Sequence, residues 1–145
     1  MTEAHSPRSG SCLCGAITLS AAQAASHVGG CHCRMCRRWG GGPYLELDCG
    51  TEVTISGEEN LSLFSSSDWA ERGFCARCGT HLFYRLKESQ QHMVAVGLFD
   101  DQQDLTFKRQ VFIEEKPPYY HFGNDTENLT GEEIFALFSD DNDSN

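Results

Sequence analysis

Eight cysteines among 145 residues are the feature that most restricts this chain. Seven of them fall into three short clusters, Cys12-Leu-Cys14, Cys31-His-Cys-Arg-Met-Cys36 and Cys75-Ala-Arg-Cys78, and the eighth is Cys49. The N-terminal residues contain no apolar segment typical of a secretion signal, so we expect a cytoplasmic protein whose thiols stay reduced. In such a compartment clustered cysteines bind metal more often than they form disulfides.

The first and third clusters share one pattern. Each has two cysteines, followed at once by a glycine and then by a predicted strand. A glycine in such a turn tolerates positive φ and lets backbone N–H groups face the sulfurs. Two turns of this kind would together supply four thiolates, the ligand set of a closed structural zinc site. We predict that its ligands are Cys12, Cys14, Cys75 and Cys78.

The middle cluster has three cysteines and no obvious fourth partner. Cys31, Cys33 and Cys36 would leave one coordination position open, which distinguishes a catalytic zinc from a structural one. Three thiolates already cancel the +2 charge and make the metal a weak Lewis acid, poorly suited to generating hydroxide. Such a site is better suited to holding a substrate thiol as a thiolate. We therefore predict two zinc ions per chain, one structural and one catalytic.

Three residues compete for the open position. His32 lies between two ligands, His27 lies four residues upstream, and Cys49 follows thirteen residues after Cys36. If Cys49 completed the site, both zinc ions would be structural; we favour instead a buried cysteine that acts as a small hydrophobe. His27, His32 and His81 are also the candidates for a general base.

Arg34, Arg37 and Arg38 surround the middle cluster in a chain of net charge −10. They could bind the carboxylates of an anionic thiol substrate, or simply offset the negative zinc-thiolate centre. The overall charge argues against nucleic acid and anionic membrane surfaces as partners. No apolar run is long enough to span a bilayer.

Short alternating segments separated by Gly, Ser and Asp predict a mainly β protein with several short antiparallel sheets. We expect one zinc-bearing domain over residues 10–138, between a solvated tail at 1–9 and an acidic one at 139–145. The predicted strands are Ala16–Ala21, Tyr44–Cys49, Glu52–Ser56, Leu61–Phe64, Thr80–Leu86, Met93–Phe99 and Leu105–Glu114.

A short helix is predicted near the C-terminal end. Thr130 and Glu133 form a capping-box pattern, in which each side chain bonds the backbone N–H of the other residue. Leu129 and Ile134 occupy the positions of a hydrophobic staple. The apolar stripe continues beyond them, so we expect the helix to pack against the sheet. Its further members are Phe135, Leu137 and Phe138.

The order of the clusters resembles the glutathione-dependent formaldehyde-activating enzyme family, which includes centromere protein V. The resemblance rests on Gly10-Ser-Cys-Leu-Cys-Gly15, Cys31-His-Cys-Arg-Met-Cys36 and Arg72-Gly-Phe-Cys-Ala-Arg-Cys-Gly79, and covers most of residues 10–120. It implies a mainly β fold with a structural zinc on the first and third clusters and a catalytic zinc on the middle one. It also implies a carbon–sulfur lyase that joins formaldehyde to glutathione as S-(hydroxymethyl)glutathione, with the three arginines as counter-charges.

Two alternatives remain beside this hypothesis. One is a lyase that acts on a different thiol or aldehyde. The other is a zinc-stabilised module that binds a protein partner without catalysis. An accessible metal with a labile ligand beside the arginines would favour an enzyme, whereas an apolar groove without one would favour the module. The sequence contains no indication of the oligomeric state.

Overall fold

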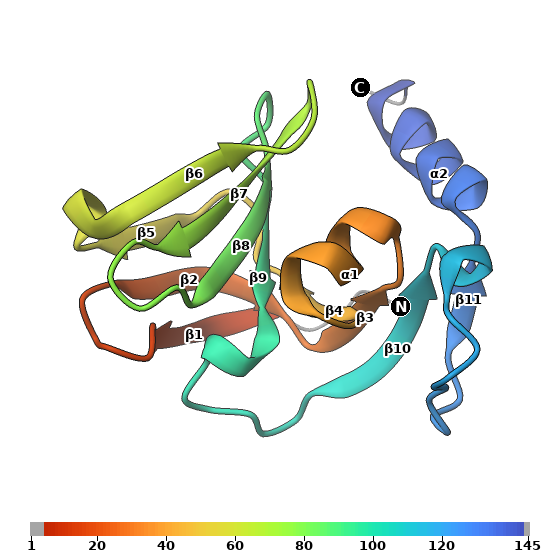
Figure 1. Ribbon diagram of the computed structural model, residues 1–145, viewed down its shortest axis with the longest axis horizontal. Helices are drawn as coiled ribbons and strands as arrows, with labels where there is room; N and C mark the ends of the chain where they lie inside the picture. The colour runs from red at the N-terminus through yellow and green to blue at the C-terminus, as the bar shows by residue number, and fades with distance from the viewer. Residues whose placement is uncertain (1–4, 144–145) are drawn as a thin grey trace. The chain divides into compact units, whose positions relative to one another are not determined.

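The protein is mainly β and divides into two compact units (Figure 1). The computed structural model describes the backbone of residues 5–143 and the side chains of residues 5–138. The first unit comprises residues 5–28 and 46–106, and the second comprises residues 29–45 and 107–143. The domain predicted over residues 10–138 spans both units.

Antiparallel strands make up most of the first unit. β1 (His5–Ser11), β2 (Thr18–Ala25) and β5 (Val53–Ser56) form a three-stranded sheet in that order. Residues 46–48 of β4 (Tyr44–Asp48) begin a second antiparallel series in the order β4-β9-β8-β7-β6. Its other strands are β6 (Leu61–Ser65), β7 (Ala70–Cys75), β8 (His81–Leu86) and β9 (His92–Ala95). The 3-10 helices η1 (Glu58–Asn60) and η2 (Val96–Leu98) lie between strands of this unit.

A row of paired residues across the second series forms the centre of the core. Leu47 pairs with Val94, Val94 with Phe83, and Phe83 with Gly73. The three side chains are wholly buried, as expected where one face of a sheet packs inward with a period of two residues. Cys12 and Cys75 belong to the same buried cluster, so two predicted metal ligands are part of the core.

Short elements on both sides of the middle cysteine cluster form the second unit. Its sheet has the order β11-β10-β3, in which β10 and β11 are parallel. The elements that lie wholly or mostly in this unit are β3 (His27–Cys31), α1 (Arg34–Gly40), β10 (Thr106–Val111), η3 (Ile113–Glu115), β11 (Glu127–Leu129) and α2 (Gly131–Asp143). No helix within residues 5–143 is long and apolar enough to cross a membrane.

Two adjacent carboxylates of η3 bind the N-termini of both helices in this unit. A Glu115 oxygen accepts the N–H of Arg34 at 2.9 Å, and both Glu114 oxygens lie 3.1 Å from the nitrogen of Gly131. Each carboxylate satisfies a backbone donor that has no partner inside its helix and favours the positive end of the helix dipole.

All seven predicted strands overlap strands of the structure, but two of them end too late: Val96–Leu98 form the 3-10 helix η2 and residues 113–114 belong to η3. The capping box is confirmed: the Glu133 N–H donates to the Thr130 hydroxyl oxygen at 3.1 Å, and the Thr130 N–H donates to the Glu133 carboxylate at 2.9 Å. The strands β1, β3, β7 and β11, the helix α1 and the three 3-10 helices were not predicted.

The expected packing of α2 is wrong for most of its apolar stripe. Ile134 is buried, but Phe135, Leu137 and Phe138 are 50%, 42% and 38% exposed. The reason is one of size, because the neighbouring strand β11 has three residues whereas α2 has thirteen. At about 3.3 Å per strand residue and about 1.5 Å per helix residue, the strand is roughly half as long as the helix.

Regular structure also enters both predicted tails. β1 begins at His5, so the prediction of a solvated tail is wrong for residues 5–9; residues 1–4 lie outside the described part. A register shift between Ser6 and Arg8 accommodates Pro7, which cannot donate to the ladder. The Arg8 guanidinium donates to two backbone carbonyls, those of Asp101 and Gln103. Pairing with β2 and the two hydrogen bonds of Arg8 therefore keep residues 5–9 in a strand, although their composition is polar.

At the other end, the backbone of α2 continues to Asp143, inside the acidic segment predicted as a tail from residue 139. The prediction is therefore wrong for the backbone of residues 139–143, because the helix capped at Thr130 extends into them. Residues 144–145 lie outside the described part.

At Gly10 the backbone of β1 lies close to the backbone of Leu98. A Cβ atom at this position would lie 1.9 Å from the carbonyl oxygen of Leu98, whereas a Cβ at Gly97 would meet nothing within 4 Å. We expect Gly10→Ala to lower the free energy of unfolding by about 3 kcal/mol because the backbone must move. Urea denaturation followed by far-ultraviolet circular dichroism checks this, with Gly97→Ala as the matched control. Equal stability of the two variants would contradict the close approach.

Candidate metal centres

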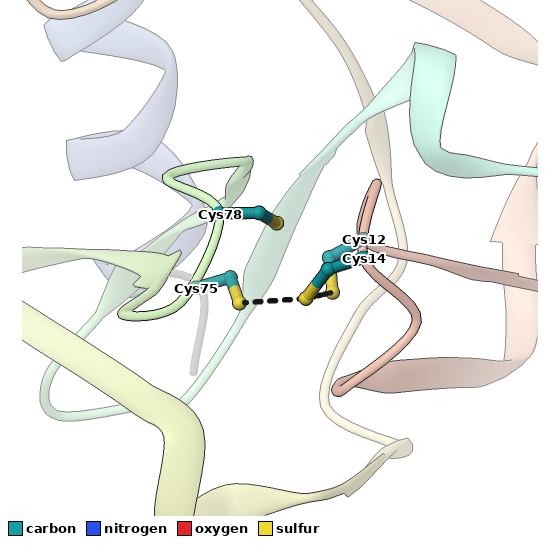
Figure 2. A group of neighbouring side chains, drawn as sticks. All are labelled: Cys12, Cys14, Cys75 and Cys78. Carbon is teal, nitrogen blue, oxygen red and sulfur yellow. Dashed lines mark hydrogen bonds between the residues drawn. The ribbon is translucent and has the colours of Figure 1, made fainter.

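The four cysteines of the first and third clusters converge within the first unit. Their sulfur atoms all lie within 4.8 Å of one another, and their side chains point toward a common centre from two turns (Figure 2). The Sγ atoms of Cys12 and Cys14 are 3.7 Å apart, and those of Cys14 and Cys75 are 3.8 Å apart. Sulfurs placed tetrahedrally about 2.3 Å from one zinc ion would be about 3.8 Å apart. The donor set and its spacing therefore fit a tetrahedral metal ion.

Two similar turns position these sulfurs. Gly15 and Gly79, each directly after the second cysteine of its pair, have φ of 81° and 78°. Their N–H groups donate to the carbonyl oxygens of Cys12 and Cys75 at 3.0 and 2.8 Å, which closes each turn. The N–H of Ile17 then points at the sulfur of Cys12, 3.3 Å away. The predicted glycine turns are thus present in both clusters.

Thr80, which is not among the predicted site residues, joins the two turns. Its hydroxyl oxygen accepts the N–H of Leu13 at 3.0 Å and lies 3.1 Å from the sulfur of Cys78. The hydroxyl can donate to that sulfur when Cys78 is a thiolate, because its oxygen already accepts from the first turn. A hydroxyl residue directly after the Cys-Gly of one turn was the only sequence signal.

The pKa values of three of these cysteine thiols shift in opposite directions, because ionisation of one thiol disfavours ionisation of another. The hydroxyl and N–H of Thr80 lower the pKa of Cys78 to about 5. Burial raises the pKa of Cys12, but the Ile17 N–H and neighbouring thiols outweigh it and lower that pKa overall. The Ala16 N–H lowers the pKa of Cys14, but desolvation and the other three thiols raise it to about 11. A divalent cation would allow all four to ionise together.

The three cysteines of the middle cluster converge within the second unit. Their sulfur atoms also lie within 4.8 Å of one another. Cys31 ends β3, Cys33 is the N-cap of α1, and Cys36 is buried in its first turn. The N–H of Cys36 donates to the Cys33 sulfur at 3.4 Å. Hydrogen bonds from Cys33 and Cys36, then burial and their charges, raise the pKa of Cys31 far above its usual range. A cation is needed to hold three thiolates there.

His32 does not complete this group. His32 is wholly buried, and its ring nitrogens are engaged elsewhere: Nδ1 lies 2.8 Å from the Tyr120 hydroxyl and Nε2 lies 2.7 Å from Gln110 Oε1. His27 and Cys49 belong to the first unit, where Cys49 is wholly buried in the core and burial raises its pKa to about 12. Within the described residues of the second unit, no other His, Cys, Asp or Glu joins the three sulfurs.

The three arginines differ in how firmly they are held. Arg34 and Arg38 are exposed, whereas Arg37 is half-buried and its Nε donates to the carbonyl oxygen of His32 at 2.8 Å. Among the three arginines, Arg37 is therefore the one whose side chain is oriented by a hydrogen bond next to the cysteines. Arg34 uses its backbone N–H, not its guanidinium, to bind Glu115.

The candidate bases have different surroundings. Burial lowers the pKa of His32; the hydrogen bond with Gln110 opposes this shift, and the charges of Lys116 and Arg37 add to it, so the pKa is lowered overall. Burial and the charge of Arg72 lower the pKa of His81, which belongs to the first unit. Tyr120, which is not among the predicted site residues, is the partner of His32, and no signal within the cysteine motif indicates a residue 88 positions away.

The contact of Thr80 with Cys78 leads to a prediction about metal affinity. Thr80→Val removes the hydroxyl that bonds a ligand and links the two turns, so we expect zinc to bind the four-cysteine group about 10–100-fold more weakly. Thr54→Val, at an exposed position of β5, is the matched control. Competition with a chromophoric chelator measures both variants. Affinity equal to that of the control would show that the hydroxyl does not support the ligands.

Comparison with known proteins identifies the family. The family model described as glutathione-dependent formaldehyde-activating enzyme matches residues 7–115, which contain all seven clustered cysteines. A Schizosaccharomyces pombe protein described as an uncharacterized lyase is 36% identical over 126 residues, covering 86% of this chain and 92% of that protein. A crystal structure of a Rhodobacter sphaeroides protein has a similar fold, with TM-score 0.54 and 24% identity over 63% of this chain and 87% of that one. The chain belongs to the glutathione-dependent formaldehyde-activating enzyme family.

Proposed function

We propose that this protein is a carbon–sulfur lyase that adds a small anionic thiol, of the glutathione type, to an aldehyde such as formaldehyde. The observation that carries the proposal is the contrast between the two cysteine groups. One has four converging sulfurs and is complete, whereas the other has three and no fourth ligand among the described residues of its unit. A site with one position left for substrate is the arrangement expected of a catalytic metal centre.

The reaction joins two molecules without loss of atoms. The sulfur of the thiol attacks the carbonyl carbon of the aldehyde, a C–S bond forms, and the C=O π bond breaks. The thiol proton ends on the former carbonyl oxygen, so the product is a hydroxymethyl thioether; the reverse direction is the lyase reaction. A zinc ion bound by Cys31, Cys33 and Cys36 would keep the incoming sulfur ionised and nucleophilic.

The arginines support an anionic thiol as the substrate. Arg37 is oriented by the carbonyl of His32, which lies between the first two cysteines of the motif, and can present its remaining N–H groups to a carboxylate. Arg34 and Arg38 are exposed on the same helix and complete a local positive charge in a chain of net charge −10. We propose that the three arginines bind the carboxylates of the thiol.

The four-cysteine group has a structural role in this proposal. Two of its sulfurs lie in the buried core, so a zinc ion there would connect the β1–β2 turn to the β7–β8 turn and stabilise the first unit. Reduced thiols are needed at both groups and in the substrate, which favours the cytoplasm.

A second candidate is a zinc-stabilised module that binds a protein. Leu63, Phe64 and Trp69, on and next to the β6–β7 hairpin, are 47%, 62% and 52% exposed, which favours a contact surface there. This candidate needs neither an open metal position nor the arginines.

Exchange spectroscopy separates the two candidates. We expect the protein to accelerate exchange between free formaldehyde and its glutathione adduct, measured by nuclear magnetic resonance with ¹³C-formaldehyde above the uncatalysed rate. Cys33→Ala should lose at least about 100-fold of this acceleration, because removing a ligand costs more than removing a residue that only supports one. Elemental analysis should show a fall from about two zinc ions to about one per chain.

The matched control is Cys49→Ala, which removes a buried thiol outside both groups. Its zinc content and exchange rate should match those of the unaltered protein. A wild-type exchange rate no faster than buffer, with both zinc ions bound, would overturn the enzymatic proposal and favour the binding module.

A further inference from the structure

His32 is bonded through every polar group that it has. Its backbone N–H donates to the carbonyl of Val111 at 3.1 Å, and its carbonyl accepts from Nε of Arg37 at 2.8 Å. Its ring nitrogens lie 2.8 Å from the Tyr120 hydroxyl and 2.7 Å from Gln110 Oε1. The residue is wholly buried, although its neighbours in the chain, Cys31 and Cys33, are both partly accessible. Such complete bonding fixes the side chain in one orientation.

A chain of side chains fixes the direction of these hydrogen bonds. Gln110, which is 4% exposed, donates through Nε2 to the Thr126 hydroxyl at 2.9 Å, and that hydroxyl donates to Asn128 Oδ1 at 2.7 Å. The Gln110 amide must therefore present its oxygen to the ring, so His32 donates from Nε2. The other ring nitrogen, Nδ1, lies within hydrogen-bonding distance of the Tyr120 hydroxyl.

The far partner, Tyr120, is itself held in place. The Lys116 ammonium donates to the carbonyls of Pro117 and Tyr120, and its nitrogen lies 5.2 Å from the centre of the Tyr120 ring. Phe122 packs near both rings, with centroids 6.1 Å from His32 and 6.2 Å from Tyr120. The hydroxyl that bonds Nδ1 thus belongs to a fixed segment, and not to a mobile side chain on the surface.

We propose that His32 is a positioning residue of the three-cysteine site, and that Tyr120 and Gln110 act on the site through it. The imidazole lies between Cys31 and Cys33 in the chain, so fixing it limits the directions from which their sulfurs leave the backbone. The same residue orients Arg37 through its carbonyl, so it connects the metal ligands to the proposed substrate contact. This inference rests on the proposed function only for its catalytic part; its metal-binding part is independent.

The test compares two neighbouring tyrosines. Tyr120→Phe keeps the ring and removes only the hydroxyl that bonds His32, whereas Tyr119→Phe makes the same change at a residue that is 69% exposed. Both full-length proteins are titrated with Co²⁺, whose visible absorption reports the geometry of thiolate ligands. The spectrum of Cys33→Ala supplies the contribution of the four-cysteine group, which is subtracted.

We expect Tyr120→Phe to weaken Co²⁺ binding at the three-cysteine site at least about tenfold and to shift its absorption bands. The four-cysteine signal and the far-ultraviolet spectrum should stay unchanged. With zinc bound, kcat for adduct exchange should fall by about tenfold, whereas KM for glutathione should change little because Arg37 keeps its bond to the backbone. Tyr119→Phe should match the wild type in all of these.

A double-mutant cycle guards against a purely structural effect. His32→Gln keeps an amide N–H that can donate to Gln110 but has no atom in the place of the ring nitrogen Nδ1, so it removes the same hydrogen bond from the other side. We expect the double variant Tyr120→Phe/His32→Gln to bind Co²⁺ no more weakly than the weaker single variant. Additive losses, or an unshifted cobalt spectrum in Tyr120→Phe, would overturn the positioning role. Loss of the four-cysteine signal together with the three-cysteine signal would also overturn it.

The two proposals fail in different ways. If wild-type protein shows no adduct exchange but Tyr120→Phe still alters the cobalt site, the proposed function is wrong and the positioning role stands. If exchange is catalysed and Tyr120→Phe leaves both kcat and the cobalt spectrum unchanged, the function stands and the positioning role is wrong.

Discussion

The first unit brings the sulfur atoms of four cysteines within 4.8 Å of one another, although they would repel one another as thiolates. The packing of its core depends on how this repulsion is relieved, because two of the cysteines belong to the core. The turns that carry the four cysteines are about sixty residues apart in the chain, and two of the sulfurs lie in the same buried cluster as Leu82 and Phe83. A cation bound there would neutralise charge that the apolar surroundings could not tolerate. Binding of such a cation would therefore be coupled to burial of the core in this unit.

The two cysteine groups solve the same electrostatic problem by different means. The four-cysteine group is assembled from distant turns and is supported where they meet, by the hydroxyl of Thr80. The three-cysteine group comes from six consecutive residues, and the N-cap of α1 brings two of its sulfurs together locally. The histidine between its first two cysteines is instead held by residues 78 and 88 positions away. The four-cysteine group is thus supported from within its own turns, whereas the histidine of the three-cysteine motif is held by a separate segment of the chain.

Features set by neighbouring residues could be predicted from the sequence. The glycine turns and the capping box of α2 follow from local steric and hydrogen-bonding preferences. The helix α1 could not be predicted, because its seven residues begin inside the cysteine motif and show no apolar period. The contacts of His32 with Gln110 and Tyr120 depend on tertiary structure, as does the exposure of Phe135 and Leu137, so no local pattern records them.

The 3-10 helix η3 restricts which insertions and deletions the sequence can accept during evolution. Its neighbouring carboxylates, Glu114 and Glu115, reach the first N–H groups of two different helices, so their order along the chain assigns one to each. Inserting or deleting one residue just before them would rotate the pair by about 120°, the angle per residue of a 3-10 helix. Both helix ends would then lose their acceptors together. Residues 112–115 should therefore resist changes of length more strongly than changes of composition, and insertions among relatives should fall in other loops.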